Sequence, residues 1–208
     1  MRKHYSHNED YFEVIDTEPK AYWLGFMAAD GCVRNCSHSK WIFSINQAVK
    51  DVHHIQKFKE AIEATNPIYY QNKTNSAVRL RINSKKTCLD LIDKGIVPNK
   101  SLILEPPKNV LQNLIRHWIR GYFDGDGCIS IRPKRKGRKR VTILGTNEVC
   151  EFISSQIPFN TPISKFQNIY RVRINREKAI QWVYQYFYLD STVFLERKHI
   201  KFCDEEGK

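Results

Sequence analysis

Hydrophobic and polar positions follow the same order in the two halves of the chain. Apolar runs with small residues four positions apart predict two helices, one over 16–30 and one that starts near Val110 and ends at Asp126. Alternation and apolar runs predict strands over 41–46, 78–83, 141–144 and 170–175. Further helices are predicted over 51–64, 85–94, 147–156 and 177–188. Each half follows the order helix, two strands, helix, two strands, helix, which predicts an α+β fold.

The helix that opens each half carries a repeated motif. Residues 23–32 read WLGFMAADGC and residues 119–128 read IRGYFDGDGC. The identical positions lie 96 residues apart, at Gly25/Gly121, Asp30/Asp126, Gly31/Gly127 and Cys32/Cys128. The repeat predicts halves over 1–104, with a polar arm at 1–15, and over 110–208, joined by a proline-containing linker at 105–109.

Both motif helices end at Asp-Gly, and we expect the glycine to take the left-handed position that closes a helix. A carboxylate at a helix C-terminus faces the negative end of the helix dipole, at a cost of about 0.3–1 kcal/mol. If the two helices pack together through their small residues, Asp30 and Asp126 converge. Like charges that meet must share a proton or bind a cation. Asp124 corresponds to Ala28 in the first copy, so only Asp30 and Asp126 are common to both halves.

The two motifs, with the approach YFEVIDTEPKAYWLG over 11–25, resemble the paired motifs of LAGLIDADG homing endonucleases. The resemblance covers nearly the whole chain. It implies two pseudo-symmetric αββαββα halves that form a saddle of two antiparallel sheets, with the motif helices at the central seam. It also implies a monomer that cuts both strands of double-stranded DNA at a long, imperfectly palindromic site. Such cuts leave 3′ overhangs and promote insertion of the element that encodes the enzyme.

A cation held by two acids suits the hydrolysis of a phosphodiester, because a divalent metal stabilises the attacking and leaving oxygens. Mg²⁺ suits a site with few protein ligands, since it keeps several waters, and Mn²⁺ is an expected substitute. We therefore expect Asp30 and Asp126 to bind metal, assisted by the carbonyl oxygens of Ala29 and Gly125. No small-molecule cofactor is expected.

The resemblance also implies a basic residue beside each scissile phosphate. By local pattern, Lys100 and Lys198 correspond to these catalytic lysines. The alternative, that both are ordinary surface lysines, stays open. Gln47 is a weaker candidate for organising solvent, because its repeat mate is not a glutamine.

A formal charge of +12, in a chain that is 41% hydrophobic, indicates a folded protein with a polyanionic partner. Two arginine-rich strands and a basic loop at 132–140 are the expected contacts. The alternatives are that the arginines guard strand edges, that the loop is only a surface loop or resembles a nuclear-targeting signal, and that the charge serves solubility. The predicted DNA-binding residues are Arg34, Lys40, Ser44, Asn46, Arg79, Arg81, Arg132, Lys134, Arg135, Lys136, Arg138, Lys139, Arg140, Thr142, Arg171 and Arg173.

Other functions remain open. A maturase that acts in RNA splicing, or a DNA-binding regulator, would use the same fold without cutting, and a hydrolase of small phosphoesters would leave the basic strands unexplained. A zinc site at Cys32, Cys36 and His38 lacks a second close pair of ligands, and we expect His53 and His54 to face solvent or pack partly. The longest apolar run falls short of the ~20 residues that span a bilayer. We expect a soluble intracellular protein, and an organellar origin stays open.

Overall fold

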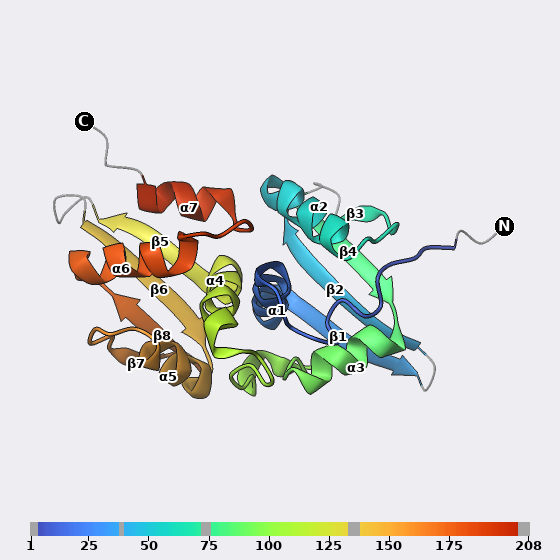
Figure 1. Ribbon diagram of the computed structural model, residues 1–208, viewed down its shortest axis with the longest axis horizontal. Coiled ribbons are helices and arrows are strands. Elements are labelled where there is room, and N and C mark those ends of the chain that lie inside the picture. The colour runs from blue at the N-terminus through green and yellow to red at the C-terminus, as the bar shows by residue number, and fades with distance from the viewer. Residues whose placement is uncertain (1–3, 38–39, 72–75, 133–137, 204–208) are drawn as a thin grey trace.

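The computed structural model describes residues 4–37, 40–71, 76–132 and 138–203. Two similar halves, each a sheet with its helices, lie side by side in Figure 1. The first half contains α1 (Glu18–Asp30), β1 (Gly31–Ser37), β2 (Lys40–Ala48), η1 (Val49–Asp51), α2 (Val52–Ala61), β3 (Ile68–Gln71), β4 (Ala77–Asn83), α3 (Lys85–Asp93) and η2 (Lys100–Leu102).

The second half repeats this order. It contains η3 (Gln112–Leu114), α4 (Ile115–Asp126), β5 (Gly127–Arg132), β6 (Arg138–Gly145), α5 (Asn147–Ser155), β7 (Ile163–Phe166), β8 (Ile169–Ile174), α6 (Glu177–Tyr188) and α7 (Glu196–Cys203). The expected α+β fold with αββαββα halves is confirmed, and α7 is an addition that the sequence pattern did not predict. No helix in the described part of the chain is long and apolar enough to cross a membrane.

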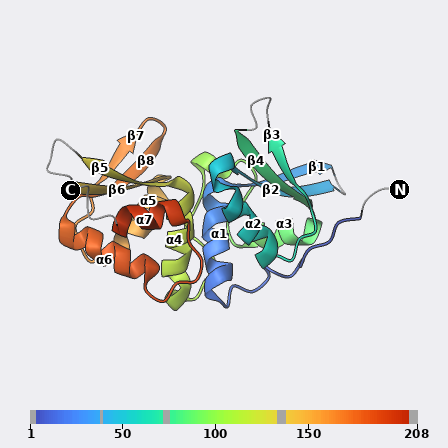
Figure 2. The same cartoon turned by 90° about the horizontal axis from the view of Figure 1, so that it is seen from above.

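Both sheets are antiparallel and have the same strand order, β1-β2-β4-β3 in the first half and β5-β6-β8-β7 in the second. In Figure 2 the strands of both sheets lie toward the top of the view, and α2, α3, α6 and α7 lie below them. Alternation along β4 buries Val78, Leu80 and Ile82 on the helix side. The opposite face of each sheet is therefore left free of helices.

The motif helices α1 and α4 lie against each other between the two sheets (Figure 2). Their contact depends on glycine, because a Cβ atom at Gly25 would collide with the carbonyl of Trp118. A Cβ at Gly121 would collide with the carbonyl of Tyr22 in the same way. The prediction that small residues let the helices touch is confirmed.

The two glycines that follow the motif acids are not left-handed, so that prediction is wrong. Gly31 has φ −77° and Gly127 has φ −94°, both extended. The chain passes directly from helix to strand, and a Cβ at Gly31 would lie 2.5 Å from the Met27 carbonyl oxygen. A Cβ at Gly127 would lie 2.5 Å from the Phe123 carbonyl oxygen. Close approach, and not a positive φ, explains the two glycines.

Four other expectations need correction. The arm at 1–15 is not wholly polar surface, because Phe12 and Ile15 are buried in the core. His54 is buried and shares a hydrogen bond of 2.8 Å between Nε2 and the Tyr22 hydroxyl. The second motif helix begins at Ile115 after a 3₁₀ turn, five residues later than expected. The α2 helix is likewise shorter than the predicted 51–64, since it spans Val52–Ala61 and ends three residues early.

Candidate active site

The motif acids Asp30 and Asp126 are the last residues of α1 and α4. Because the helices touch along their length, these ends lie together at the seam. A Cβ built on Gly125 would lie 3.0 Å from Oδ2 of Asp30, so the Asp30 carboxylate reaches the end of the opposite helix. The structure thus brings together the two acids that the repeat singled out.

The environment of the acids disfavours two negative charges. Burial, together with the nearby charge of Asp30, raises the pKa of Asp126 to about 6. Burial also raises the pKa of Asp30, against a hydrogen bond from Gln47 that lowers it. Two partly buried carboxylates at one point favour a shared proton or a bound cation.

Each motif helix also receives a lysine at its C-terminal end. Lys100 donates from Nζ to the carbonyl oxygen of Ala29 at 2.8 Å. Lys198 donates from Nζ to the carbonyls of Phe123 and Asp124, both at 2.7 Å, and of Gly125 at 3.2 Å. A cation at the negative end of a helix is favourable, so each lysine offsets the unfavourable placement of the neighbouring aspartate.

Both lysines are buried, with exposed fractions of 8% for Lys100 and 4% for Lys198. Burial lowers the pKa of Lys198 to about 8, and burial lowers the pKa of Lys100 as well. The acids raise both pKa values in turn, so the four groups are electrostatically coupled. Two ordinary surface lysines would not be buried in this way.

The acids and carbonyls form a set of oxygen donors that fits a hard divalent ion. The carbonyls of Ala29 and Gly125, which we expect to assist, accept hydrogen bonds from the lysines, and a carbonyl oxygen has a second lone pair. In the described residues no group of three or more histidine, cysteine, aspartate or glutamate side chains is placed to hold a metal.

The two acids have different polar neighbours. Gln47 of β2 donates from Nε2 to Oδ2 of Asp30 at 2.5 Å. In the second half the strand register puts Gly145 at the place of Gln47, and a Cβ there would lie 2.8 Å from the Tyr122 hydroxyl. The Tyr122 hydroxyl donates its hydrogen to the Leu144 carbonyl at 3.0 Å, and its proximity to Asp126 lowers the pKa of that carboxyl.

Tyr122 is a residue that sequence reasoning missed. Its repeat mate is Phe26, which has the same ring without the hydroxyl. That difference between the two copies was the available signal, but it has meaning only once the strand register shows that a glycine replaces Gln47.

The free face of each sheet carries matched pairs of polar residues. Ser44 of β2 lies opposite Arg81 of β4 in the first sheet. Thr142 of β6 lies opposite Arg173 of β8 in the second sheet. In each sheet, Ser44 or Thr142 lies opposite the second residue of the strand that follows the motif helix. The two pairs therefore occupy equivalent places relative to the motif acids.

Neighbouring side chains hold several of these arginines. Arg79 donates from Nε to Oδ1 of Asn46 at 2.5 Å. Arg171 and Arg173 both donate to the hydroxyl of Ser164 at 3.2 Å. Because an arginine whose Nε is engaged keeps its terminal nitrogens, such a residue is ready for a bidentate contact with a base or phosphate.

The other predicted DNA-binding residues divide into three groups. Arg34, Lys40 and Arg138 are exposed, and Arg140 donates to Oδ1 of Asn175 at 2.8 Å. Lys139 lies on the helix-covered face and donates from Nζ to the carbonyl of Phe202 at 2.7 Å, so it does not join the free face. Only the backbone of Arg132 is described, and the remaining three lie outside the described residues: Lys134, Arg135 and Lys136.

The zinc hypothesis gains no support from the described residues. Cys32, Cys36 and Cys128 are free and exposed, and no metal-binding group includes them in the part of the chain the structure covers. His38 lies outside that part.

A scan against protein-family models finds no match, and neither does a search of curated proteins. Solved structures do match. The LAGLIDADG meganuclease I-AabMI bound to uncleaved DNA is 13% identical, with a TM-score of 0.61 over 88% of each chain. I-SmaMI bound to uncleaved DNA with calcium ions is 14% identical, with a TM-score of 0.62 over 88% of each chain.

The homing endonuclease I-SmaMI bound to cleaved DNA is 15% identical, with a TM-score of 0.62 over 88% of this chain and 87% of that chain. At such identities the likeness concerns the arrangement of elements and not the residues of the site. The chain has the fold of the LAGLIDADG meganucleases.

Proposed function

We propose that this protein is a metal-dependent homing endonuclease that hydrolyses phosphodiester bonds of double-stranded DNA at a long, imperfectly palindromic site. The observation that carries the proposal is the meeting of Asp30 and Asp126 at the seam, beside two buried lysines and between two basic sheet faces. Solved proteins with the same fold are bound to DNA, one of them to cleaved DNA. Intron homing is the corresponding biological role.

In the proposed site Asp30 and Asp126 hold the metal, with Mg²⁺ as the expected ion and Mn²⁺ as a substitute. When bound, a divalent ion would stabilise the oxygens that attack and leave the phosphorus atom. Gln47 orients the Asp30 carboxylate through its hydrogen bond, and Tyr122 is a polar neighbour of Asp126. The neighbour bound with calcium ions supports divalent metal use on this fold.

Lys100 and Lys198 contribute positive charge beside the scissile phosphates. With a pKa of about 8, Lys198 is mostly protonated at neutral pH, so its ammonium group supplies positive charge close to an oxygen that gains negative charge. Each lysine serves the helix end that it contacts. The two strands of the duplex are therefore cut by two sites of similar but not identical composition.

The sheets supply binding. Arginines on the free faces contact phosphates and base edges, and the formal charge of +12 favours approach to a polyanion. Because the two faces are pseudo-symmetric but differ in residues, each half of the target resembles the other without matching it. One chain contains both halves, which supports action as a monomer.

The test is incubation of purified protein with a library of random duplexes and Mg²⁺, followed by sequencing of the new ends. We expect breaks at one related set of sites, absent with Asp30→Asn or Asp126→Asn, while these variants keep DNA binding. Asp93→Asn, an exposed carboxyl of α3, is the matched control and should cut normally. Retention of DNA without breaks by the unaltered protein would overturn the nuclease and favour a maturase or a DNA-binding regulator.

A further inference from the structure

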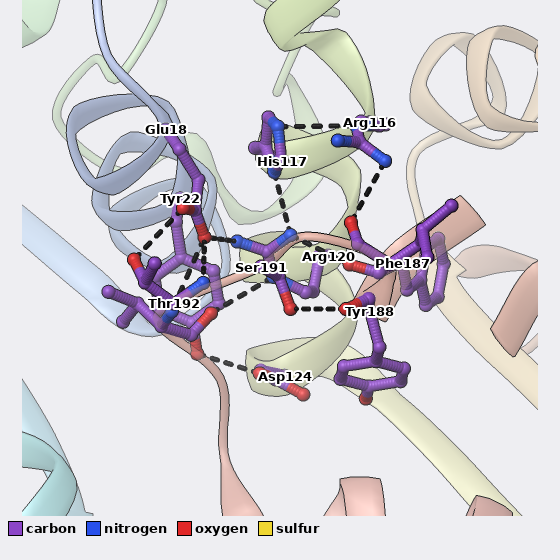
Figure 3. Close-up of polar contacts among 12 residues, drawn as sticks. Glu18, Tyr22, Arg116, His117, Arg120, Asp124, Phe187, Tyr188, Ser191 and Thr192 are labelled. Atoms are coloured by element: carbon purple, nitrogen blue, oxygen red, sulfur yellow. Dashed lines mark hydrogen bonds and ion pairs between the residues drawn. The ribbon is translucent and has the colours of Figure 1, made fainter. Parts of the chain in front are cut away.

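The segment 189–195, here called the strap, joins α6 to α7 and is bonded to both motif helices. Glu18 of α1 accepts hydrogen bonds from the backbone N of Thr192 at 2.7 Å, its hydroxyl at 2.9 Å, and the N of Val193 at 3.3 Å. Arg120 of α4 donates to the carbonyls of Val193 at 3.0 Å and Phe187 at 2.7 Å. Figure 3 shows these contacts converging on the strap.

Charges that are removed from water hold the strap. Arg120 is fully buried and pairs with Glu18 at 2.6 Å. Three further N–H donors of Arg120 have partners, in Val193, Phe187 and, at 2.7 Å, Nδ1 of His117. A buried ion pair with these additional hydrogen bonds is costly to displace, because displacement leaves a charge unpaired. The strap is thus fixed against the seam.

Asp124 holds the end of the strap where α7 begins. Its Oδ2 accepts a hydrogen bond from the backbone N of Leu195 at 2.7 Å and another from the Tyr22 hydroxyl at 2.7 Å. The side chain is buried, with 1% exposed. In Figure 3 the Asp124 carboxylate points from α4 toward Tyr22 of α1.

Leu195 in turn places Lys198. The Leu195 carbonyl accepts hydrogen bonds from the backbone N of Lys198 at 2.9 Å and of His199 at 3.2 Å, which start the α7 helix. Lys198 lies in the first turn of that helix, and its Nζ returns to the carbonyls at the end of α4. Asp124 therefore contacts both residues. Its carboxylate accepts a hydrogen bond from the Leu195 amide, and its main-chain carbonyl accepts one from the Lys198 ammonium group.

The described residues of the first half contain no matching arrangement. The repeat mates of Arg120 and Asp124 are the apolar residues Leu24 and Ala28. Lys100 donates to the Ala29 carbonyl alone among the described residues, and its segment continues along the chain into the linker at 105–109. The two lysines therefore reach equivalent places by different means.

Given the proposed endonuclease activity, we propose that Asp124 is a positioning residue for Lys198, dedicated to the cut made at the α4 end. Its carboxylate sets the start of α7 and thereby the place of the Lys198 ammonium group. The cut made at the α1 end, where Lys100 acts, does not depend on it. Loss of the carboxylate should therefore unbalance the two strand cuts.

The test uses a duplex target with each strand labelled separately and a supercoiled plasmid that reports nicking. In Asp124→Ala, which copies the first half, we expect one strand to be cut about tenfold to a hundredfold more slowly, as a misplaced catalytic group predicts. Nicked plasmid should accumulate. Asp124→Asn keeps an oxygen for Leu195 and Tyr22 and should restore balanced cutting.

Ile153→Ala is the matched control, because Ile153 is fully buried on α5, which packs on β6 and β8, whereas the two lysines lie on η2 and α7. The substitution destabilises the second half but lies outside the strap, so cleavage of the two DNA strands should slow equally. Equal slowing of both strands in Asp124→Ala would mean a merely structural role and would overturn the proposal. If the unaltered protein cuts neither DNA strand, the proposed endonuclease function is itself wrong.

Hydrogen exchange tests the placement without any cleavage. The Leu195 amide should be protected in the unaltered protein and in Ile153→Ala at a temperature where both are folded. It should exchange at least tenfold faster in Asp124→Ala, together with the amides of Lys198 and His199. Unchanged protection at these three amides would overturn the positioning role, whatever the cleavage assay gives.

Discussion

Gln47 donates a hydrogen bond from Nε2 to Oδ2 of Asp30 at 2.5 Å, across the junction between β2 and the end of α1. The bond stabilises the ionised carboxylate, against the burial that raises its pKa. A hydrogen bond to a charged group contributes about 1.5–3 kcal/mol, and one pKa unit corresponds to about 1.4 kcal/mol. Gln47, which belongs to another element, therefore partly offsets the effect of burial on the pKa of Asp30.

Replacement of this amide should shift the pH dependence of cleavage. In Gln47→Leu the pKa of Asp30 rises, so the acid limb of the rate profile should move up by about one pH unit. Gln56→Leu is the control, because Gln56 donates to Glu60 on the exposed surface of α2, away from the motif acids. Superimposable acid limbs in Gln47→Leu and the unaltered protein would show that the bond does not tune Asp30.

The ion pair between Glu18 and Arg120 should dominate the stability of the seam. Glu18→Ala leaves the Arg120 guanidinium buried without its partner, and such a loss costs about 3–5 kcal/mol in the free energy of unfolding. Lys57→Ala removes a pair with Glu196 that is exposed on both sides and should cost less than about 1 kcal/mol. Urea unfolding of the two variants measures the contrast, and similar costs would contradict it.

The sequence predicts most of the fold because the elements carry their own periodic patterns. Alternation identifies the strand at 78–83, and the glycines of the motifs predict that α1 and α4 touch. The α7 helix has no such signal, since the sequence ERKHIKFC offers few apolar positions and reads as charged surface. Its helical state depends on Leu195 and on Lys198, which bond residues far away in the chain.

The candidate site is predicted only in part, for a related reason. Asp30, Asp126, Lys100 and Lys198 belong to patterns shared by the two halves, and the structure brings them together. Comparison of the two motif copies selects only residues that are identical in both, and it therefore excluded Asp124, which corresponds to Ala28. The strap contacts arise from tertiary packing in one half alone, which a repeat cannot reveal.

The charges of the motif acids should cost stability when no metal is present. Asp126 has a pKa of about 6 in the folded protein, against an ordinary value of 3.8. The folded state thus binds more protons than the unfolded state between these values, and stability falls as the pH rises from about 4 to 6. At pH 7 the cost is roughly 1–3 kcal/mol.

Asp126→Asn should therefore raise the free energy of unfolding at pH 7 in chelator, and the gain should vanish near pH 4. Added Mg²⁺ should raise the melting temperature of the unaltered protein and leave that of Asp126→Asn nearly unchanged. Asp93→Asn is the exposed control, and it should keep the Mg²⁺ response. If neither Mg²⁺ nor Mn²⁺ changes the melting temperature of the unaltered protein, the result would count against a metal at the seam.

The free faces of the two sheets should bind opposite halves of the target. Arg81→Ala and Arg173→Ala occupy matched positions, opposite Ser44 and Thr142. Each should weaken binding by about 1–3 kcal/mol and relax sequence preference in one half-site only, if the arginine reads a base. A phosphate contact would instead weaken all sequences equally and lower the salt slope by about one.

Lys139→Ala distinguishes the effect of the free sheet face from the effect of overall charge. It removes one positive charge from the helix-covered side, where Nζ donates to the Phe202 carbonyl. Its affinity for duplex DNA should stay within about twofold of the unaltered protein, and its salt slope should not change. Titrations in Ca²⁺ at several salt concentrations measure all three variants. Equal losses in Lys139→Ala and Arg81→Ala would mean that overall charge, and not the free sheet face, determines binding.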